Sequence, residues 1–555
     1  MTGRLKIAGG HLVDPAHGVD GVADVWIEGG RVIDAPAEPD ARADRTIDAR
    51  GYVVMAAGVA VHCHIVGPKV NAARALRPEE ARRGGGMPRD GRAVGARSGV
   101  LGSVPTSFTT GAKYAGLGYG TAVDAAIAPL GARPAHRELA DTPIIDKAFL
   151  VLMGNNHFVM DRIRGGERDR LRSFVAWMLR ATGGLGIKVV NPGGVEAWKQ
   201  GGGAIPATLD DEVPHFGVTP RQILVELARA AGDLGLPHPV HLHTLNLGLP
   251  GNSGITLETM RALDGHRAHL AHIQFHSYGG TPTDLGRMDS QAGPLADYLN
   301  AHPNLSVDVG QVMFGETTSM TADGALGQYL HQVTGRKWVS HDVELETGCG
   351  VVPITYSDRN AVHALQWAIG LEWFLRVDDP WRIALSTDHP NGGSFLAYPQ
   401  IIALLMDRGH RADVFRTLPE SVWTRSGLGD LSREYTLSEI ATITRAGPAR
   451  ILGLPRKGHL APGADGDVTI YAPEADKGRM FSLPRYVLKA GEIIVDDGDL
   501  VAWPDGQTLH AAPEFDPADE PAIAAWLEAS STVQFANYPV RGDEISNPAV
   551  IPPRI

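Results

Sequence analysis

Short runs of alternating apolar residues occupy the start of the chain and return near its end. ADVWIEGGRVIDA (residues 23–35) and YVLKAGEIIVDDGDLV (residues 486–501) both place apolar residues at nearly every second position, with Gly at the breaks. A period of two is typical of half-buried strands. We therefore predict strand-rich segments over residues 1–55 and 451–508.

The pattern changes between these segments, where short apolar runs alternate with amphipathic helical stretches. VAVHCHIV, GIKVV and HPVHLHT have the length of buried strands, and PRQILVELARAAGDLGL repeats its apolar positions with a helical period. Repeated strand–helix units are typical of a parallel sheet covered by helices. Residues 56–450 are therefore predicted to form a (β/α)8 TIM-like barrel. The Pro- and acid-rich stretch 509–555 is expected to be an irregular tail.

Composition and sequence pattern indicate the cellular compartment and the kinds of partner to expect. The 555 residues suffice for one barrel and a smaller domain. Only two cysteines occur, Cys63 and Cys349, which favours a reducing compartment. No run approaches the ~20 apolar residues of a membrane span, and the N-terminus lacks a signal-peptide pattern, so a cytoplasmic protein without a membrane partner is expected. The net charge of -12 argues against a nucleic-acid partner.

Residues that can bind metal recur at the C-terminal ends of the predicted barrel strands, where barrel enzymes place their chemistry. His62 and His64 form His-x-His on one strand, so both point to the same face. Lys188 ends GIKVV, where it would otherwise face a packed interior, and Asp388 follows ALST. Five more histidines close two further strands: His241 and His243 in HPVHLHT, and His269, His272 and His276 in AHLAHIQFH.

Each of these residues also has a structural explanation. A lysine such as Lys188 can extend its amine to the surface, and an aspartate such as Asp388 can cap a helix. Their recurrence at one strand end after another favours a metal site, and histidine with carboxylate favours zinc. Cys63 lies between the two histidines of His-x-His and is expected to pack on the opposite face.

The order His-x-His, Lys, His, His, Asp resembles the pattern of the amidohydrolase superfamily, which includes dihydroorotases and hydantoinases. The resemblance implies one or two zinc ions, bridged by a lysine that is carboxylated on its amine. It also implies that the two strand-rich segments form one small β-sandwich domain, since RAGPARILGLPRKGHLAPGADGDVTIY resembles the family's exit from the barrel. The implied ligands are His62, His64, Lys188, His241, His272 and Asp388, with His243 and His276 ranked below them.

One position departs from that pattern. Superfamily members usually carry an aspartate two residues before the first histidine, and this chain has Ala60 there. The change removes a carboxylate that could hold a metal-binding histidine in place.

Longer segments are similar to one branch of the superfamily, the family of the A subunit of formylmethanofuran dehydrogenase. GIKVVNPGGVEAW, AHIQFHSYGG and STDHPNGGSFLAYP are among them. The resemblance implies hydrolysis of the formyl group of a formyl-methanofuran-type carrier to formate and free amine, within a formyltransferase/hydrolase complex of one-carbon metabolism. The Ala-, Arg- and Gly-rich composition favours this bacterial version. The alternatives are a formylmethanofuran dehydrogenase component working in the CO2-reducing direction, a cyclic-amide hydrolase, or a catalytically silent structural subunit.

Roles for individual residues follow from this reading. Asp388 is expected to take a proton from the metal-activated water and to pass it to the leaving nitrogen. Asn246 and Asn252 in TLNLGLPGN and Tyr356 in PITYSDRN are candidates for binding substrate, and Asn191 is similar. Their structural alternative is loop capping.

Positive charge gathers after His64. Residues 69–97 contain eight basic and three acidic residues, a net charge of +5 in a chain whose total is -12. Arginine binds carboxylates bidentately, and the resemblance implies a carrier with an acidic tail. Arg74, Arg82 and Arg83 are therefore expected to bind that tail. A solvated loop, or a surface that docks an acidic partner protein, is the alternative.

Overall fold

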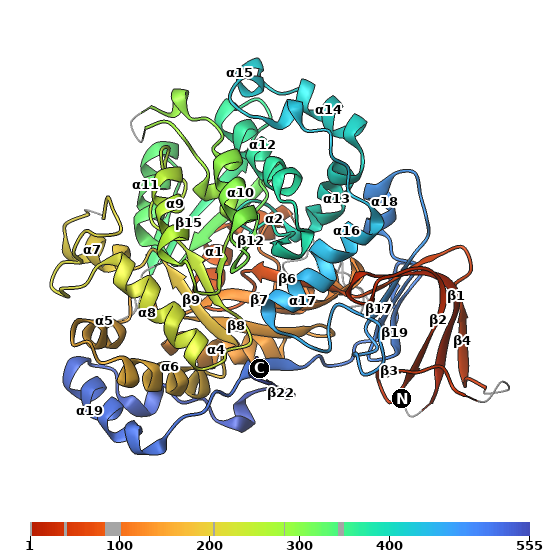
Figure 1. Ribbon diagram of the computed structural model, residues 1–555, viewed down its shortest axis with the longest axis horizontal. Coiled ribbons are helices and arrows are strands. Elements are labelled where there is room, and N and C mark those ends of the chain that lie inside the picture. The colour runs from red at the N-terminus through yellow and green to blue at the C-terminus, as the bar shows by residue number, and fades with distance from the viewer. Residues whose placement is uncertain are drawn as a thin grey trace.

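The two ends of the chain share one sheet beside a barrel (Figure 1). The computed structural model describes residues 3–37, 42–83, 102–203, 206–281, 284–341 and 349–554. Strand β5 pairs in parallel with β1 and antiparallel with β17, so the N- and C-terminal segments are hydrogen-bonded directly to each other. The nine strands are β1 (Leu5–Asp14), β2 (Val19–Glu28), β3 (Arg31–Ile33), β4 (Arg45–Asp48), β5 (Val53–Ala56), β17 (Val468–Tyr471), β18 (Tyr486–Lys489), β19 (Glu492–Asp496) and β20 (Asp499–Leu500). The predicted β domain built from both ends of the chain is present, and its strands are hydrogen-bonded into one nine-stranded sheet.

Eight parallel strands form the barrel, which confirms the predicted fold class. The first seven strands pair in chain order, each with the next, and the seventh pairs with the eighth, β16. A bridge between Cys63 and His389 brings the segment after β16 back to the first strand. The strands are β6 (Gly58–Cys63), β7 (Tyr119–Ile127), β8 (Asp146–Leu152), β9 (Gly186–Val190), β10 (Val240–His243), β11 (Ala268–Leu270), β12 (Leu305–Asp308) and β16 (Ile383–Ala384).

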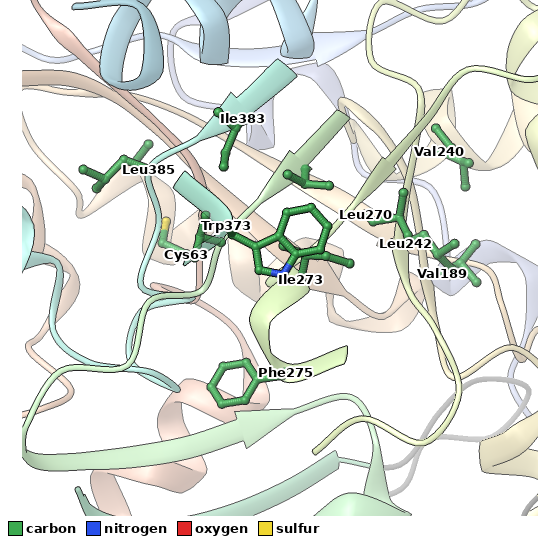
Figure 2. Packing of buried hydrophobic residues seen from close by; sticks show 14 of the residues in the cluster. Cys63, Val189, Val240, Leu242, Leu270, Ile273, Phe275, Trp373, Ile383 and Leu385 are labelled. Carbon is green, nitrogen blue, oxygen red and sulfur yellow. The ribbon is translucent and has the colours of Figure 1, made fainter. Parts of the chain in front are cut away.

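Alternation along β9 and β10 turns apolar side chains outward and brings Lys188 and the two histidines of β10 to the interior. Val189, Val240 and Leu242, labelled in Figure 2, belong to the main buried apolar cluster, which also contains the helix residues Ile223 and Leu227. Cys63 packs in the same cluster and is fully buried, as its position between two histidines predicted. The residues between them, such as Lys188, therefore face the barrel interior.

Helix α8 illustrates why these sequences form the covering helices. The Thr219 side chain accepts a hydrogen bond from the Gln222 backbone, and the Gln222 side chain accepts one from the Thr219 backbone. This capping box satisfies donors that a helix start leaves free, while Ile223 and Leu227 bury the apolar face. The helices that follow barrel strands are α3 (Ser107–Gly116), α4 (Ala132–Ala140), α5 (His157–Arg164), α6 (Arg168–Thr182), α7 (Gly194–Gln200), α8 (Pro220–Asp233), α9 (Ser253–Ala262), α10 (Ala292–Ala301), α12 (Ala361–Arg376) and α13 (Tyr398–Met406).

A small antiparallel sheet interrupts the barrel between β12 and α12. Strand β15 (Cys349–Tyr356) pairs with both β13 (Gly315–Thr321) and β14 (Val339–His341), and α11 (Gly324–Thr334) packs on β15. This insertion contributes walls to the cavity described below. The remaining helices are α1 (Pro68–Leu76), α2 (Pro78–Arg83), α14 (Arg408–Arg416), α15 (Glu420–Trp423), α16 (Leu437–Ala441), α17 (Gly447–Leu452), α18 (Lys477–Ser482) and α19 (Glu520–Ser530).

The C-terminal stretch is more regular than predicted. Strand β21 (Thr508–Ala511) pairs in parallel with β22 (Pro548–Ile551) and with β8, and the helix α19 lies between the two C-terminal strands in the chain. The expectation of an irregular tail is wrong for these elements, because Leu509 and Ile551 are buried against the barrel. None of the helices in the described parts of the chain is long and apolar enough to cross a membrane.

Candidate metal centre

Side chains that can bind metal converge at the C-terminal mouth of the barrel. They line a cavity whose opposite walls come from the inserted sheet and from α11. The cavity walls also include the apolar side chains of Leu247, Phe275 and Leu326. The lining residues that can bind metal are His64, Lys188, His243, His272 and Asp388.

Asp388 faces both histidines of the His-x-His pair. Its Oδ1 lies 2.9 Å from Nε2 of His62 and 3.1 Å from Nε2 of His64. Neither Asp388 Oδ1 nor His62 Nε2 makes a hydrogen bond with the described residues. Burial would raise the pKa of Asp388, but His272 and His62 hold that pKa well below its usual range. An ionised carboxylate and two imidazole nitrogens that point to one place are the arrangement of a metal site.

Lys188 brings an amine into the same place. Its side chain is 1% exposed, and its Nζ has no hydrogen-bond partner among the described residues. Burial lowers the pKa of Lys188 to about 8. A buried amine that is partly uncharged near neutral pH is unusual for lysine and marks a functional group.

Two more histidines complete the wall of the cavity. The rings of His243 and His272 lie 4.9 Å apart, and His243 Nε2 and His272 Nδ1 have no hydrogen-bond partner in the described structure. Burial lowers the pKa of both side chains, so each is neutral and keeps a lone pair for a metal. The ring of His276 lies 5.4 Å from the ring of His243 and 5.4 Å from that of His272. Among the described residues, however, His276 is not part of the cavity wall.

The structure brings His243, rather than His241, to the cavity. His241 lies two residues earlier on β10 and therefore one layer deeper in the barrel. Its Nε2 is 2.9 Å from Nδ1 of His62 and its Nδ1 is 2.9 Å from Nε2 of His238. Alternation turns both His241 and His243 inward, so the sequence pattern alone does not separate them.

Asp308 was missed in the sequence, although it ends barrel strand β12. Its Oδ2 lies 3.1 Å from His62 Nδ1 and 3.1 Å from His269 Nε2, and its Oδ1 accepts a hydrogen bond from the His272 backbone. Asp308 thus holds His62 by the nitrogen that faces away from Asp388. It supplies the kind of carboxylate that is missing at Ala60, and the strand-end rule applied to β12 would have found it.

The backbone around the site is strained where it turns into the cavity. His272 and Asp388 have φ values of +37° and +50°, which non-glycine residues rarely adopt. Gly310 allows this turn, because a Cβ at Gly310 would lie only 2.4 Å from Cβ of His272. The close approach therefore requires glycine at position 310.

The asparagine and tyrosine candidates divide between structure and cavity. Tyr356 lines the cavity, as expected for a residue that contacts substrate. Asn252 instead braces two loops: its amide donates to the carbonyls of Asn246 and Phe275, and its Oδ1 accepts from the backbone of Tyr278. These contacts give Asn252 a structural role, and its binding of substrate stays a prediction.

Asn246 and Asn191 lie beside a neighbouring pocket rather than the metal-facing cavity. Both take left-handed backbone conformations, with φ of +59° and +43°. The Asn191 amide donates to Asp323, whose carboxylate also lies 3.4 Å from His243 Nε2. Asp323, which the sequence pattern did not single out, thus connects this pocket to the metal-facing wall.

The described part of the basic segment is held within the fold. The Lys69 amine lies 3.3 Å from Asp124, and the Arg74 guanidinium donates to the carbonyls of Pro105 and Ile65. Arg77 pairs with Glu80 at 2.7 Å and donates to a carbonyl of β13. These inward contacts give Arg74 a structural role, and its binding of a carrier tail stays a prediction. The side chains of Arg82 and Arg83, and residues 84–97, lie outside the described residues.

The sequence profile of the amidohydrolase family matches residues 45–495. The chain belongs to the amidohydrolase family, and the family and the site together define a hydrolase. It is 44% identical to the A subunit of the formyltransferase/hydrolase complex Fhc of Methylorubrum extorquens over 539 residues, 94% of each chain. It is 41% identical to protein FwdA of Methanocaldococcus jannaschii over 565 residues, 98% of this chain and 97% of that protein.

A solved structure agrees with these relatives. The structure matches a chain of the crystal structure of the formyltransferase/hydrolase complex FhcABCD from Methylorubrum extorquens, determined in complex with methylofuran. The TM-score is 0.92 at 40% identity, and the match covers 99% of this chain and 100% of that one. The resemblance to the family of the formylmethanofuran dehydrogenase A subunit is thereby confirmed.

Proposed function

We propose that this chain is the hydrolase component of a formyltransferase/hydrolase complex and releases formate from the N-formyl group of a methanofuran-type carrier. The observation that supports this most strongly is the convergence of donors without hydrogen-bond partners, Lys188, His243 and His272 with Asp388, on one cavity. The 44% identity to the Fhc relative over nearly the whole chain supports the same substrate class and the same kind of partner subunits.

The donor set, imidazole nitrogens, a carboxylate and an amine, fits one or two zinc ions. His62, His64 and Asp388 would hold one ion, and His243 and His272 a second. An ammonium at Lys188 beside two cations would be repelled, whereas a carboxylated amine shared by both ions would supply negative charge and two oxygen ligands. When bound, zinc supplies Lewis acidity and lowers the pKa of water towards about 7.

Asp388 moves the proton in this proposal. Its carboxylate is ionised because its pKa lies well below the usual range, so it can accept a proton from the attacking water. The same oxygen then gives the proton to the leaving nitrogen. Protonation ends the resonance between that nitrogen and the formyl carbonyl, so the C–N bond can break. The apolar side chains of Leu247, Phe275 and Leu326 in the cavity wall exclude water and offer an apolar surface to the uncharged part of the carrier.

The test is a comparison of substrates on the purified complex with its metal content measured. Formate should appear in equal amount to free amine from the formylated carrier, and dihydroorotate or hydantoin should not open. Ring opening without formate release would instead support a cyclic-amide hydrolase. Co-isolation of a protein that contains molybdenum or tungsten would support the CO2-reducing direction.

A further inference from the structure

Beneath the cavity, three histidines form a continuous chain of hydrogen bonds that ends on a backbone carbonyl. His238 Nδ1 lies 3.0 Å from the carbonyl oxygen of Ile451, in α17. His238 Nε2 lies 2.9 Å from His241 Nδ1, and His241 Nε2 lies 2.9 Å from His62 Nδ1. All three side chains are 0% exposed, so water does not compete for these contacts.

The carbonyl fixes the position of every proton along this chain. A carbonyl oxygen only accepts, so His238 must carry its proton on Nδ1. In a neutral imidazole the other nitrogen is then bare, so His238 Nε2 accepts from the Nδ1–H of His241. By the same step, His241 Nε2 accepts from the Nδ1–H of His62. Burial lowers the pKa of His238 to about 3, which keeps that ring neutral.

The last link determines which nitrogen of His62 is free. The Nδ1–H of His62 is shared between His241 Nε2 and Asp308 Oδ2, at 2.9 and 3.1 Å. With Nδ1 holding that proton, Nε2 is the nitrogen of His62 that a metal can use, and it faces Asp388 Oδ1 at 2.9 Å. A histidine binds metal only through a bare nitrogen, and the partner of its other nitrogen sets which one that is.

We propose that His238 and His241 are positioning residues that lock the tautomer of His62 and so present its bare Nε2 to the metal site. Neither residue lines the cavity formed by the described residues, so neither contacts substrate. The inference rests on the metal site of the proposed function. It excludes a second metal-binding arrangement. The ligand atoms of His62, His241 and Asp308 lie within 4.8 Å of one another and could otherwise hold an ion of their own.

The experiment measures how fast metal leaves the fully loaded complex when a chelator is added. His238→Phe keeps a ring but removes the acceptor, whereas His238→Gln keeps an acceptor oxygen near the position of Nε2. The matched control is His136→Phe, since His136 is also buried and donates to a carbonyl, that of Thr182, but lies on α4 away from the site.

His238→Phe should speed metal loss by about 10- to 100-fold. It should also shift the visible spectrum of the cobalt-substituted protein, while its thermal midpoint falls no further than that of His136→Phe. His238→Gln should lose metal at close to the wild-type rate. Equal rates for the Phe and Gln variants would overturn the proposal, and so would a third metal equivalent per wild-type chain.

These readouts need no substrate, so the two proposals fail separately. A chain that retains metal as described but releases no formate contradicts the proposed function and leaves the tautomer lock standing. A wild-type chain that binds no metal contradicts both.

Discussion

Asp388 Oδ1 lies 2.9 Å from Nε2 of His62, although the two residues come from the last and the first barrel segments. The contact stands where the backbone bridge between Cys63 and His389 closes the barrel. The metal-facing geometry therefore depends on ring closure, and residues 326 positions apart in the chain become one site. For variants that alter this geometry, metal content should be measured first and the rate of hydrolysis second.

His243→Ala should reduce the metal content by about one equivalent and lower hydrolysis by about 100-fold or more, since it removes a donor that faces the cavity. His276→Ala is the matched control, because His276 is equally buried but does not line the cavity of the described chain. Metal analysis of both purified complexes checks this. Full metal content in His243→Ala would show that His243 is not a ligand.

Lys188→Met should abolish metal binding and change how the stability of the metal-free protein depends on pH. Burial lowers the pKa of Lys188 in the folded protein to about 8, against an unfolded value near 10.4. Between these values the unfolded chain binds more protons, so the free energy of unfolding of wild type rises with pH. Chemical denaturation at pH 7.5 and pH 10 should show this rise, and Lys188→Met should lack it. Identical pH profiles would contradict the buried, unpaired amine.

Gly310→Ala should displace His272 and lower metal content. The added Cβ would lie 2.4 Å from Cβ of His272, 2.8 Å from its Cα and 3.5 Å from Cβ of Asp388. Gly265→Ala is the control: Gly265 has a similar φ, +76° against +66°, but a Cβ there would have no atom within 4 Å. Both variants should lose about 1 kcal/mol from the left-handed backbone, and only Gly310→Ala should lose metal. Equal metal content in the two would refute the role of the close contact.

A buried ion cluster joins the small sheet to the barrel and should dominate its stability. Lys489 Nζ lies 2.6 Å from Asp146 on β8 and 2.7 Å from Asp467, which also lies 2.7 Å from Lys457. Asp467→Asn removes a carboxylate that both buried ammonium groups contact, and should cost about 3 kcal/mol at pH 7. Asp48→Asn, in a solvent-exposed pair with Arg50, should change little.

The pH dependence of that loss has a definite sign. Burial would raise the pKa of Asp467, but Lys457 and Lys489 outweigh it and lower the pKa below its usual value. The stabilisation is therefore complete above the unfolded pKa of about 3.9 and is lost as the pH falls below it. The difference between wild type and Asp467→Asn should shrink below pH 4. A difference that stays constant from pH 7 to pH 3 would exclude the ion cluster as its source.

Strand periodicity predicted which residues face the barrel interior, but not how far each lies from the mouth of the barrel. His62, His64 and Lys188 were found because alternation and strand ends place inward-facing polar residues at the mouth. Periodicity did not decide between His241 and His243, which share one face of β10, because the depth of a residue depends on the register of the neighbouring strands. The count of charged residues predicted less, because it does not reveal that the Arg74 guanidinium donates to backbone carbonyls.

The C-terminal elements were missed for a different reason. Leu509 and Ile551 are buried, but they stand in stretches rich in Pro and acidic residues, which read as irregular. Strand β21 pairs with β8 of the barrel and β22 pairs with β21, so the barrel rather than the local sequence determines their conformation.

The most direct test of the account is formate release by complexes that carry wild-type or Asp388→Asn chains at matched metal content. Asparagine keeps the shape of the side chain and one oxygen but cannot take up a proton. Wild type should convert the formylated carrier to equal amounts of formate and free amine, and Asp388→Asn should be slower by about 10²- to 10⁴-fold. Near-full formate release by metal-loaded Asp388→Asn, or none by metal-loaded wild type, would contradict it.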